Sequence, residues 1–333
     1  MRMRHRRFLG PLIRLFLPGV AAGLLGACGG ARSPSAPTVP VPVATPPDNF
    51  AAGSVIQIVS GETAAPIDGA SVTIAGRTYT SAAGRITLQD RVPLRSEVDI
   101  VAAGMLERHT LVRDPALNAF ALWPARSPTG MDEGYTQAIV YNHSGGPSPL
   151  RRLARGTTRV AVVLSADIGA DPAAVAAHQE AADRVTAASG GQVVYALATQ
   201  APSTGVWVDV KLAAGDPSCD EEQSLLGYEQ SFTRNGEIVR AQIVYCDYKT
   251  ARTSAASHEM GHTFGLFHSP DKAELMYGFF NGHGGVDFSA RESLEMRLML
   301  QRPAGNVFPD DDRTAAAAAG ERTFTTVCRT SPR

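Results

Sequence analysis

Alternation of hydrophobic and polar residues is the pattern that most constrains how the first third of this 333-residue chain can fold. Between residues 50 and 123 the alternation occurs in short runs, which Gly-rich turns separate about every eight to twelve residues. A period of two places successive side chains on opposite faces of a strand, so one face of each run can be buried. Short runs at this spacing predict a small antiparallel β-sandwich. The hydrophobic positions include Ala70, Val72, Ile74, Ile86, Leu88, Val98 and Ile100.

The run PIDGASVTIAGRTYTSAAGRITL, residues 66–88, resembles the carboxypeptidase-regulatory-like (transthyretin-like) β-sandwich. Ser81 stands where that pattern usually has an aspartate. No cluster of residues in this segment suggests chemistry, and its one histidine, His109, is expected at the surface or on a strand. We therefore interpret residues 50–123 as a spacer or adhesion module. The positions that carry the resemblance are Gly69, Ala70, Val72, Ile74, Thr80, Gly84, Ile86 and Leu88.

The pattern changes at about residue 124 to mixed strands and helices. Asp171 and Pro172 form a favourable N-cap and first-turn pair for a helix that reaches about Ser189. Because that helix joins the first two strands, we expect them to be parallel. Residues 124–333 are thus predicted to form an α+β domain with a twisted mixed sheet and three helices, which makes the chain multidomain. The expected strands are 159–164, 193–198, 206–212 and 242–246, the last with 238 as an alternative start, and a last helix is expected over about 289–301.

Three of the chain's eight histidines lie within the eleven residues HEMGHTFGLFH, which begin at His258. On a helix, His258 and His262 lie one turn apart on the same face, so both can bind one metal ion. Gly265 can adopt a positive φ and end the helix, which lets His268 approach the same ion from another direction. Three protein ligands leave a fourth position for water, as in catalytic zinc sites.

The glutamate of this run, Glu259, is placed to act as a general base. Zinc lowers the pKa of water to about 7 and polarises the scissile carbonyl, so a nearby carboxylate can take the proton of the attacking water and pass one to the leaving amine. An HExxH sequence alone is a weak signal, but a glycine and a third histidine at fixed further positions make a chance match rare. The pattern therefore predicts zinc-dependent hydrolysis of peptide bonds.

The full pattern H-E-x-x-H-x-x-G-x-x-H resembles the signature of the metzincin zinc proteases. Met276, eight residues after His268, resembles the methionine of the family's Met-turn. Ser269 and the run Leu275-Met276-Tyr277 are similar to the matrixin branch. The resemblance covers about residues 157–302 and implies a shallow cleft between an upper subdomain with the sheet and a lower one with the Met-turn.

The same resemblance implies roles for further residues. Met276 would support the site from below without binding the metal, and Tyr277, Gly278 and Phe279 would form part of the S1′ wall. The strand near residues 241–246 would be the sheet edge that pairs with an extended peptide. The chain departs from animal matrixins in two respects, since neither a cysteine-switch propeptide nor the histidines of a second, structural zinc site are evident.

Calcium sites are a further possibility among the acidic residues. The candidates are Asp167, Asp171 and Asp216, or the run Pro-Asp-Asp-Asp at 309–312. A solvated acidic loop without calcium is the alternative. We therefore expect one catalytic zinc and treat calcium as unsupported by the pattern.

The N-terminus has the composition of an export signal. Arginines in the first seven residues precede an apolar run whose uncharged part, 15–25, is too short to span a bilayer comfortably. The tetrapeptide Leu25-Gly26-Ala27-Cys28 resembles the lipobox of bacterial lipoproteins, which implies cleavage before Cys28 and its acylation. Several acyl chains on one residue would anchor the protein stably in a membrane of the cell envelope. An ordinary secretory signal with a chance cysteine is the alternative.

A proline-rich segment, residues 29–49, separates this signal from the first domain. It holds six prolines and few large side chains, so it is expected to be extended and to bury no core. Export would place the chain where disulfides form. Cys219 follows the third predicted strand and Cys246 ends the fourth, so we favour this pair. Cys328 would be free, or would replace one of the two.

Composition excludes some classes of partner. The formal net charge is −1, so no basic field favours nucleic acid. We expect a monomer whose partners are a peptide or protein substrate and, through Cys28, a membrane. The predicted function is a lipid-anchored zinc endopeptidase, and the alternative is a catalytically silent lipoprotein that binds peptides or mediates adhesion.

Overall fold

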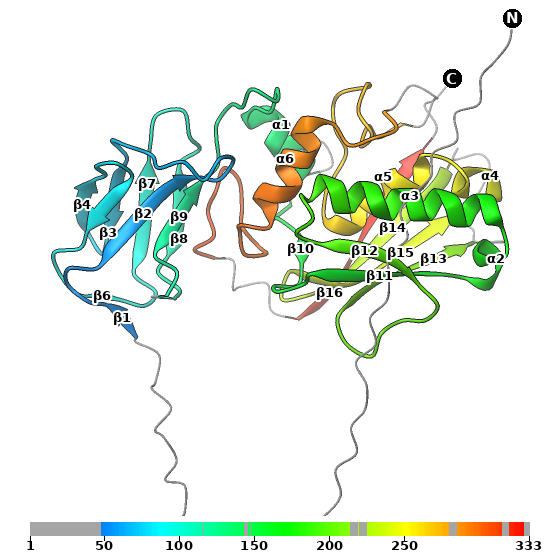
Figure 1. Ribbon diagram of the computed structural model, residues 1–333, viewed down its shortest axis with the longest axis horizontal. Helices are drawn as coiled ribbons and strands as arrows, with labels where there is room; N and C mark the ends of the chain where they lie inside the picture. The colour runs from blue at the N-terminus through cyan, green and yellow to red at the C-terminus, as the bar shows by residue number, and fades with distance from the viewer. Residues whose placement is uncertain are drawn as a thin grey trace, which may run out of the picture. The chain divides into compact units, whose positions relative to one another are not determined.

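The computed structural model describes residues 48–329 except 115, 143–145, 147, 214–218, 220–224, 280–284 and 315–319. The described residues form two hydrophobic cores. One core lies among short strands and is built from buried residues between Phe50 and Leu122. The other lies between a larger sheet and its helices and is built from buried residues between Leu106 and Met299. The mixed α/β architecture with several sheets agrees with a multidomain chain (Figure 1).

The first core is enclosed by two small sheets, of order β5-β2-β9 and β4-β3-β7-β8, and a strand pair β1-β6 lies beside them. Every second residue of β2, Ile56, Ile58 and Ser60, is buried, as the alternation predicts. The prediction of a wholly antiparallel sandwich is wrong, however, because β2 and β9 run parallel. Alternation determines which side chains are buried but not the direction of a neighbouring strand. The strands are β1 (Asn49–Phe50), β2 (Val55–Ser60), β3 (Ser71–Ile74), β4 (Arg77–Thr80), β5 (Arg85–Thr87), β6 (Val92–Pro93), β7 (Glu97–Val101), β8 (Arg108–Leu111) and β9 (Ala119–Leu122).

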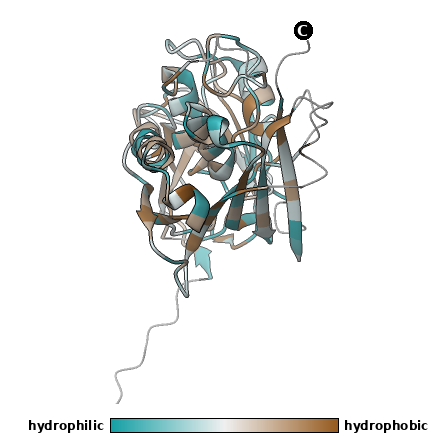
Figure 2. Ribbon diagram, turned by 90° about the vertical axis from the view of Figure 1, so that its right-hand side faces the viewer, coloured by the Kyte–Doolittle hydropathy of each residue, from teal (hydrophilic) through white to brown (hydrophobic). Residues whose placement is uncertain are grey.

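The second core lies on a mixed sheet of order β12-β11-β13-β15-β14-β16, with the short β10 also paired to β15. β11, β12, β13 and β15 pair in parallel, which confirms the expected direction of the first two strands. β14 and β16 are antiparallel additions at one side. Figure 2 shows brown hydrophobic and teal hydrophilic segments along the strands of this face. The strands are β10 (Arg152–Leu153), β11 (Arg159–Leu164), β12 (Val194–Ala198), β13 (Val206–Leu212), β14 (Leu225–Arg234), β15 (Glu237–Tyr245) and β16 (Glu321–Arg329).

The helices pack on this sheet, and α3 contacts both β12 and α5 (Figure 1). The predicted caps are confirmed. The carboxylate of Asp171 accepts hydrogen bonds from the backbone N–H groups of Ala173 and Ala174, at 3.0 and 3.4 Å, at the start of α3. Ser289 and Glu292 form a capping box at the start of α6. The helices are α1 (Glu133–Tyr141), α2 (Ala166–Gly169), α3 (Pro172–Ala188), α4 (Tyr248–Ala251), α5 (Ala255–Phe264) and α6 (Ala290–Met299).

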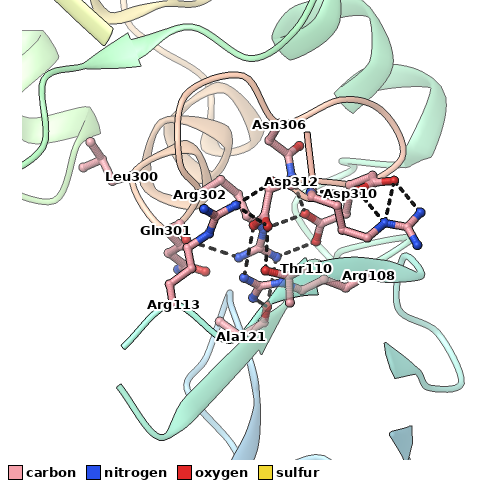
Figure 3. Close-up of polar contacts among 12 residues, drawn as sticks. Arg108, Thr110, Arg113, Ala121, Leu300, Gln301, Arg302, Asn306, Asp310 and Asp312 are labelled. Atoms are coloured by element: carbon pink, nitrogen blue, oxygen red, sulfur yellow. Dashed lines mark hydrogen bonds and ion pairs between the residues drawn. The ribbon is translucent and has the colours of Figure 1, made fainter. Parts of the chain in front are cut away.

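The acidic run at 309–312 is neither a solvated loop nor an open calcium site. Asp310 is fully buried and receives two hydrogen bonds of 2.6 Å from the guanidinium of Arg302 (Figure 3). Asp312 is also buried and accepts a hydrogen bond of 2.6 Å from the hydroxyl of Thr110 on β8. These carboxylates are compensated by arginine and hydroxyl donors, as buried charges require, and they tie the C-terminal part of the chain to the sandwich.

Among the described residues, the other acidic candidates for calcium do not form a group that could hold a metal ion. Asp171 caps α3 and forms an ion pair with Arg252. Asp167 lies exposed in the first turn of α2. Asp216 lies outside the described residues.

Candidate metal centre

α5 places two imidazoles side by side. His258 and His262 are fully buried, and their Nε2 atoms are 3.1 Å apart. The helix ends at Gly265, which has a φ of 119°, and a Cβ built there would lie 2.4 Å from the backbone oxygen of Arg151. Only glycine fits this position, both for its backbone conformation and for the space around it.

The chain returns after Gly265 and brings His268 to the other two histidines. The ring centroid of His268 lies 5.4 Å from that of His258 and 4.8 Å from that of His262. Backbone hydrogen bonds hold the return in place, since the N–H of Phe267 donates to the carbonyl of Ile139 at 2.7 Å. The structure therefore brings together the three histidines that the sequence pattern singled out.

Backbone carbonyls orient two of these imidazoles. Nδ1 of His258 lies 2.6 Å from the carbonyl oxygen of Leu275, and Nδ1 of His262 lies 2.8 Å from that of Leu266. A carbonyl only accepts, so each Nδ1 carries the proton and each Nε2 keeps its lone pair for a metal ion. Burial lowers the pKa of His258 to about 3 and that of His262 well below its usual value. Neutral imidazole is the form that binds a metal.

Glu259 lies one residue from His258 in the same buried environment. Burial raises the pKa of its carboxyl group to about 8. Its buried Oε2 atom accepts no well-aligned hydrogen bond among the described residues, but the thiol of Cys328 interacts with this carboxyl group and partly offsets the rise in its pKa. A buried oxygen without a well-aligned hydrogen bond is costly unless a substrate, a water molecule or an ion uses it, so this atom marks a functional position.

Met276 lies under the helix, against Gly261. It is fully buried, and its backbone N–H donates to Glu292 at 2.8 Å. The N–H of Ser269 donates to the carbonyl of Met276 at 2.7 Å, which closes the loop between the third histidine and the methionine. Met276 therefore packs behind the helix, with its sulfur against Gly261.

The residues after Met276 pass beside the third histidine. A Cβ built on Gly278 would lie 3.1–3.4 Å from atoms of the His268 side chain, so the backbone passes close to this ring. The rings of Tyr277 and Phe279 have centroids 5.8 Å apart, and Phe279 is exposed. Gly278 therefore borders the histidine cluster.

The sheet edge next to this cluster differs from the prediction. The strand near residues 241–246 is not an edge, because β15 is paired on both sides, with β13 and β14. β14 was not predicted, since several of its buried residues are polar, among them Glu229, Ser231 and Thr233, and hydrophobic alternation does not reveal such a strand. β14, the next strand of the sheet, is also paired on both sides, with β15 and β16, so an extended peptide could pair with β14 only in the place of β16.

Two of the cysteines form the predicted disulfide, and the third is free. Cys219 and Cys246 form a disulfide, with Cα atoms 5.3 Å apart, which is confirmed as the preferred pairing. Cys328 is free and fully buried on β16. The sequence analysis did not connect Cys328 with the histidines, although their ligand atoms and its sulfur all lie within 4.8 Å of one another. This group of three histidines and one cysteine could hold a metal ion.

His178, on α3, is completely buried. Its Nε2 lies 3.1 Å from the hydroxyl of Tyr245, so it serves the packing of α3 on the sheet. The lipobox cysteine, Cys28, lies outside the described residues. In the part of the chain that the structure describes, no helix is both long and apolar enough to cross a membrane.

No family model and no curated protein matches the chain. Among solved structures, the chain is similar to metalloproteinase-II from Bacteroides fragilis, with a TM-score of 0.30 and 10% sequence identity over 75% of this chain and 88% of that chain. A likeness this distant carries no argument about the fold or the site. The interpretation of the site therefore rests on its own geometry.

Proposed function

We propose that the protein is a zinc-dependent endopeptidase of metzincin type. The observation that carries the proposal is the convergence of His258, His262 and His268 around one point, with the buried carboxylate of Glu259 on the same helix. Three imidazoles, two of which backbone carbonyls orient with Nε2 free, are a donor set that fits zinc. Zinc held there would act as a Lewis acid and lower the pKa of water to about 7.

The chain's own groups supply the rest of the chemistry. Glu259 would take the proton of the attacking water through its buried Oε2 and hand a proton to the leaving amine. β14 would align an extended peptide by strand pairing, and Tyr277, Gly278 and Phe279 would border the side chain that follows the scissile bond. This arrangement favours a peptide or unfolded protein as the substrate.

The test compares the full chain, purified in mild detergent, with its Glu259→Gln variant and with Glu133→Gln as a matched control. Glu133 is an exposed glutamate on α1. We expect one zinc per chain in all three proteins, cleavage of casein by the wild type and the control, and no cleavage by Glu259→Gln or after chelation. The absence of zinc from the wild type, or cleavage that survives Glu259→Gln, would overturn the proposal.

A second candidate function is a silent peptide-binding or adhesion protein. It is favoured by Cys328, because four protein ligands are typical of closed, structural zinc sites. This candidate predicts one zinc per chain but no cleavage by any variant, including variants of Cys328.

We also propose that the chain is anchored to the bacterial cell envelope through acylated Cys28. The support is the sequence Leu25-Gly26-Ala27-Cys28 after a short apolar run. A Cys28→Ala variant should lose acylation and move from the membrane fraction to the soluble or precursor fraction. Unchanged partitioning and acylation would contradict the anchor.

A further inference from the structure

Cys328 occupies the position of a fourth ligand around the three histidines. Its sulfur lies 3.3 Å from Nε2 of His258, 3.6 Å from Nε2 of His262 and 3.8 Å from Nε2 of His268. Zn–N distances of about 2.0–2.1 Å and a Zn–S distance of about 2.3 Å put a nitrogen and a sulfur about 3.6 Å apart in a tetrahedral site. The three observed distances scatter around that value, so the sulfur of Cys328 is spaced from the three imidazole nitrogens as a fourth ligand would be.

β16 reaches this position by pairing along β14. Its register runs from Glu321 opposite Arg234 to Cys328 opposite Gly227, in an antiparallel ladder. On its other side, Arg329 forms a bridge with Phe279. An extended segment therefore lies between β14 and the wall formed by residues 277–279, which is the place proposed for a peptide substrate.

The side chains of β16 that point inward each have a defined contact. The guanidinium carbon of Arg151 lies 5.2 Å from the ring centroid of Phe324 and 4.3 Å from that of Phe267, next to His268. The hydroxyl of Thr326 is bonded to the buried carboxylate of Glu229 on β14.

Alternate side chains of the strand thus meet the protein, and the third of them is Cys328. It is fully buried, whereas its neighbour Val327 is 38% exposed. This alternation is that of a strand docked by one face, as a bound peptide would be.

We propose that β16 is an intramolecular inhibitor that fills the substrate position on β14 and supplies Cys328 as the fourth metal ligand. The proposal rests on the function proposed above. With the thiolate on the metal, the position that a catalytic site keeps for water is taken, and the edge that would align a substrate is already paired. The wild type would then cleave peptides slowly, at least tenfold below its rate once β16 is displaced or removed.

The first test is spectroscopic and needs no activity. The full chain is loaded with Co²⁺ in place of zinc, and its near-ultraviolet spectrum is compared for the wild type, Cys328→Ser, Cys328→Ala and Val327→Ala. We expect a thiolate-to-cobalt charge-transfer band in the wild type and in Val327→Ala, and its loss in both Cys328 variants. In the unmodified zinc protein, alkylation of Cys328 should be slow and should accelerate at least tenfold when a chelator removes the metal. The absence of the band together with rapid alkylation of the zinc form would overturn the proposal.

The second test measures latency. Peptide cleavage is compared for the same proteins and for a chain that ends at Gly320, and the peptide ERTFTTVCR, residues 321–329, is added back to the shortened chain. We expect Cys328→Ala and the shortened chain to cleave at least tenfold faster than the wild type and Val327→Ala. The added peptide should restore inhibition, and its Cys→Ala form should be at least tenfold weaker.

The outcomes separate the two proposals. If the wild type cleaves as fast as both the Cys328 variants and the shortened chain, the peptidase stands and the inhibitor fails. If the charge-transfer band is present but no protein cleaves peptide, the peptidase itself fails, the inhibitor fails with it, and Cys328 closes a structural site.

Discussion

Gly261 and Met276 are in direct contact beneath the histidine cluster. A Cβ built on Gly261 would lie 2.4 Å from the sulfur of Met276 and 3.1 Å from its terminal carbon. The methionine thus occupies the space that any other residue at position 261 would need. The glycine between the two helical histidines is explained by packing and not by metal chemistry.

This contact predicts a strong coupling between the two positions. Gly261→Ala should lower the free energy of unfolding by about 1–3 kcal/mol through overpacking. Met276→Ala should cost about 2–5 kcal/mol by leaving a cavity. In the double variant the new methyl group enters that cavity, so the combined loss should be smaller than the sum by about 0.5–3 kcal/mol. Urea unfolding of the metal-free proteins measures this cycle, and additive losses would show that the two side chains do not compete for space.

The buried pair of Arg302 and Asp310 predicts an asymmetry between two adjacent aspartates. Asp310→Asn leaves a buried guanidinium without its counter-charge and should cost about 3–5 kcal/mol. Asp311→Asn, which weakens a partly exposed pair with Arg313, should cost about 1 kcal/mol or less. Denaturant unfolding of both variants gives the comparison. Equal losses would mean that burial does not determine the strength of these pairs.

The disulfide predicts a redox-dependent stability that is separate from metal binding. Cys219 and Cys246 are 27 residues apart, and closing a loop of that length stabilises the fold by about 3–4 kcal/mol in the chain-entropy description. A Cys219→Ser/Cys246→Ser variant should melt at a lower temperature and should no longer respond to reductant, while its zinc content stays at the wild-type value because Cys328 is not part of the bond. Unchanged melting of the wild type in reductant would contradict this.

Glu295 predicts a loss of stability as pH rises. Burial raises the pKa of its carboxyl group to about 8, above the usual 4.5, although the hydroxyl of Thr136 donates a hydrogen bond to it at 2.5 Å. Between about pH 4.5 and 8 the unfolded chain has released this proton and the folded chain has not. The unfolded chain therefore binds fewer protons, and stability falls by up to about 1.4 kcal/mol per pH unit.

A Glu295→Gln variant lacks this titration. Its stability relative to the wild type should increase from pH 4.5 to pH 8, as measured by urea unfolding at both values. The exposed Glu133→Gln serves as the control and should show little change. A constant difference between Glu295→Gln and the wild type at both pH values would contradict the assignment.

Local chemistry explains what could be predicted from the sequence. The caps at Asp171 and Ser289, the helix end at Gly265 and the convergence of the three histidines depend on spacing along one short segment or on the conformational preference of one residue. Such features need no knowledge of distant contacts. The pairing of Cys219 with Cys246 could be predicted because both residues flank strands of the predicted sheet.

Two strands and a buried ion pair could not be predicted from the sequence, because they depend on contacts between distant segments. β14 and β16 have polar residues at many positions, and their burial is compensated by partners across the sheet, such as Thr326 for Glu229. Hydrophobic periodicity does not detect strands of this kind. The sequence favours a solvated loop at Asp310, because its partner Arg302 is recognised only in the folded chain. The alternation of Phe324, Thr326 and Cys328 was the one signal that could have indicated the last strand.

The pairing of β14 with β16 also bears on the solubility of the protein. β14 is ten residues long, whereas strands in globular proteins are commonly about five or six residues long. A free edge of that length exposes a row of unpaired backbone groups, which is a template for joining the sheets of two molecules. β16 covers this edge and becomes the edge itself, where its exposed charged residues Glu321, Arg322 and Arg329 disfavour further pairing. A form of the protein without β16 would expose the edge of β14, which another extended chain would then have to cover.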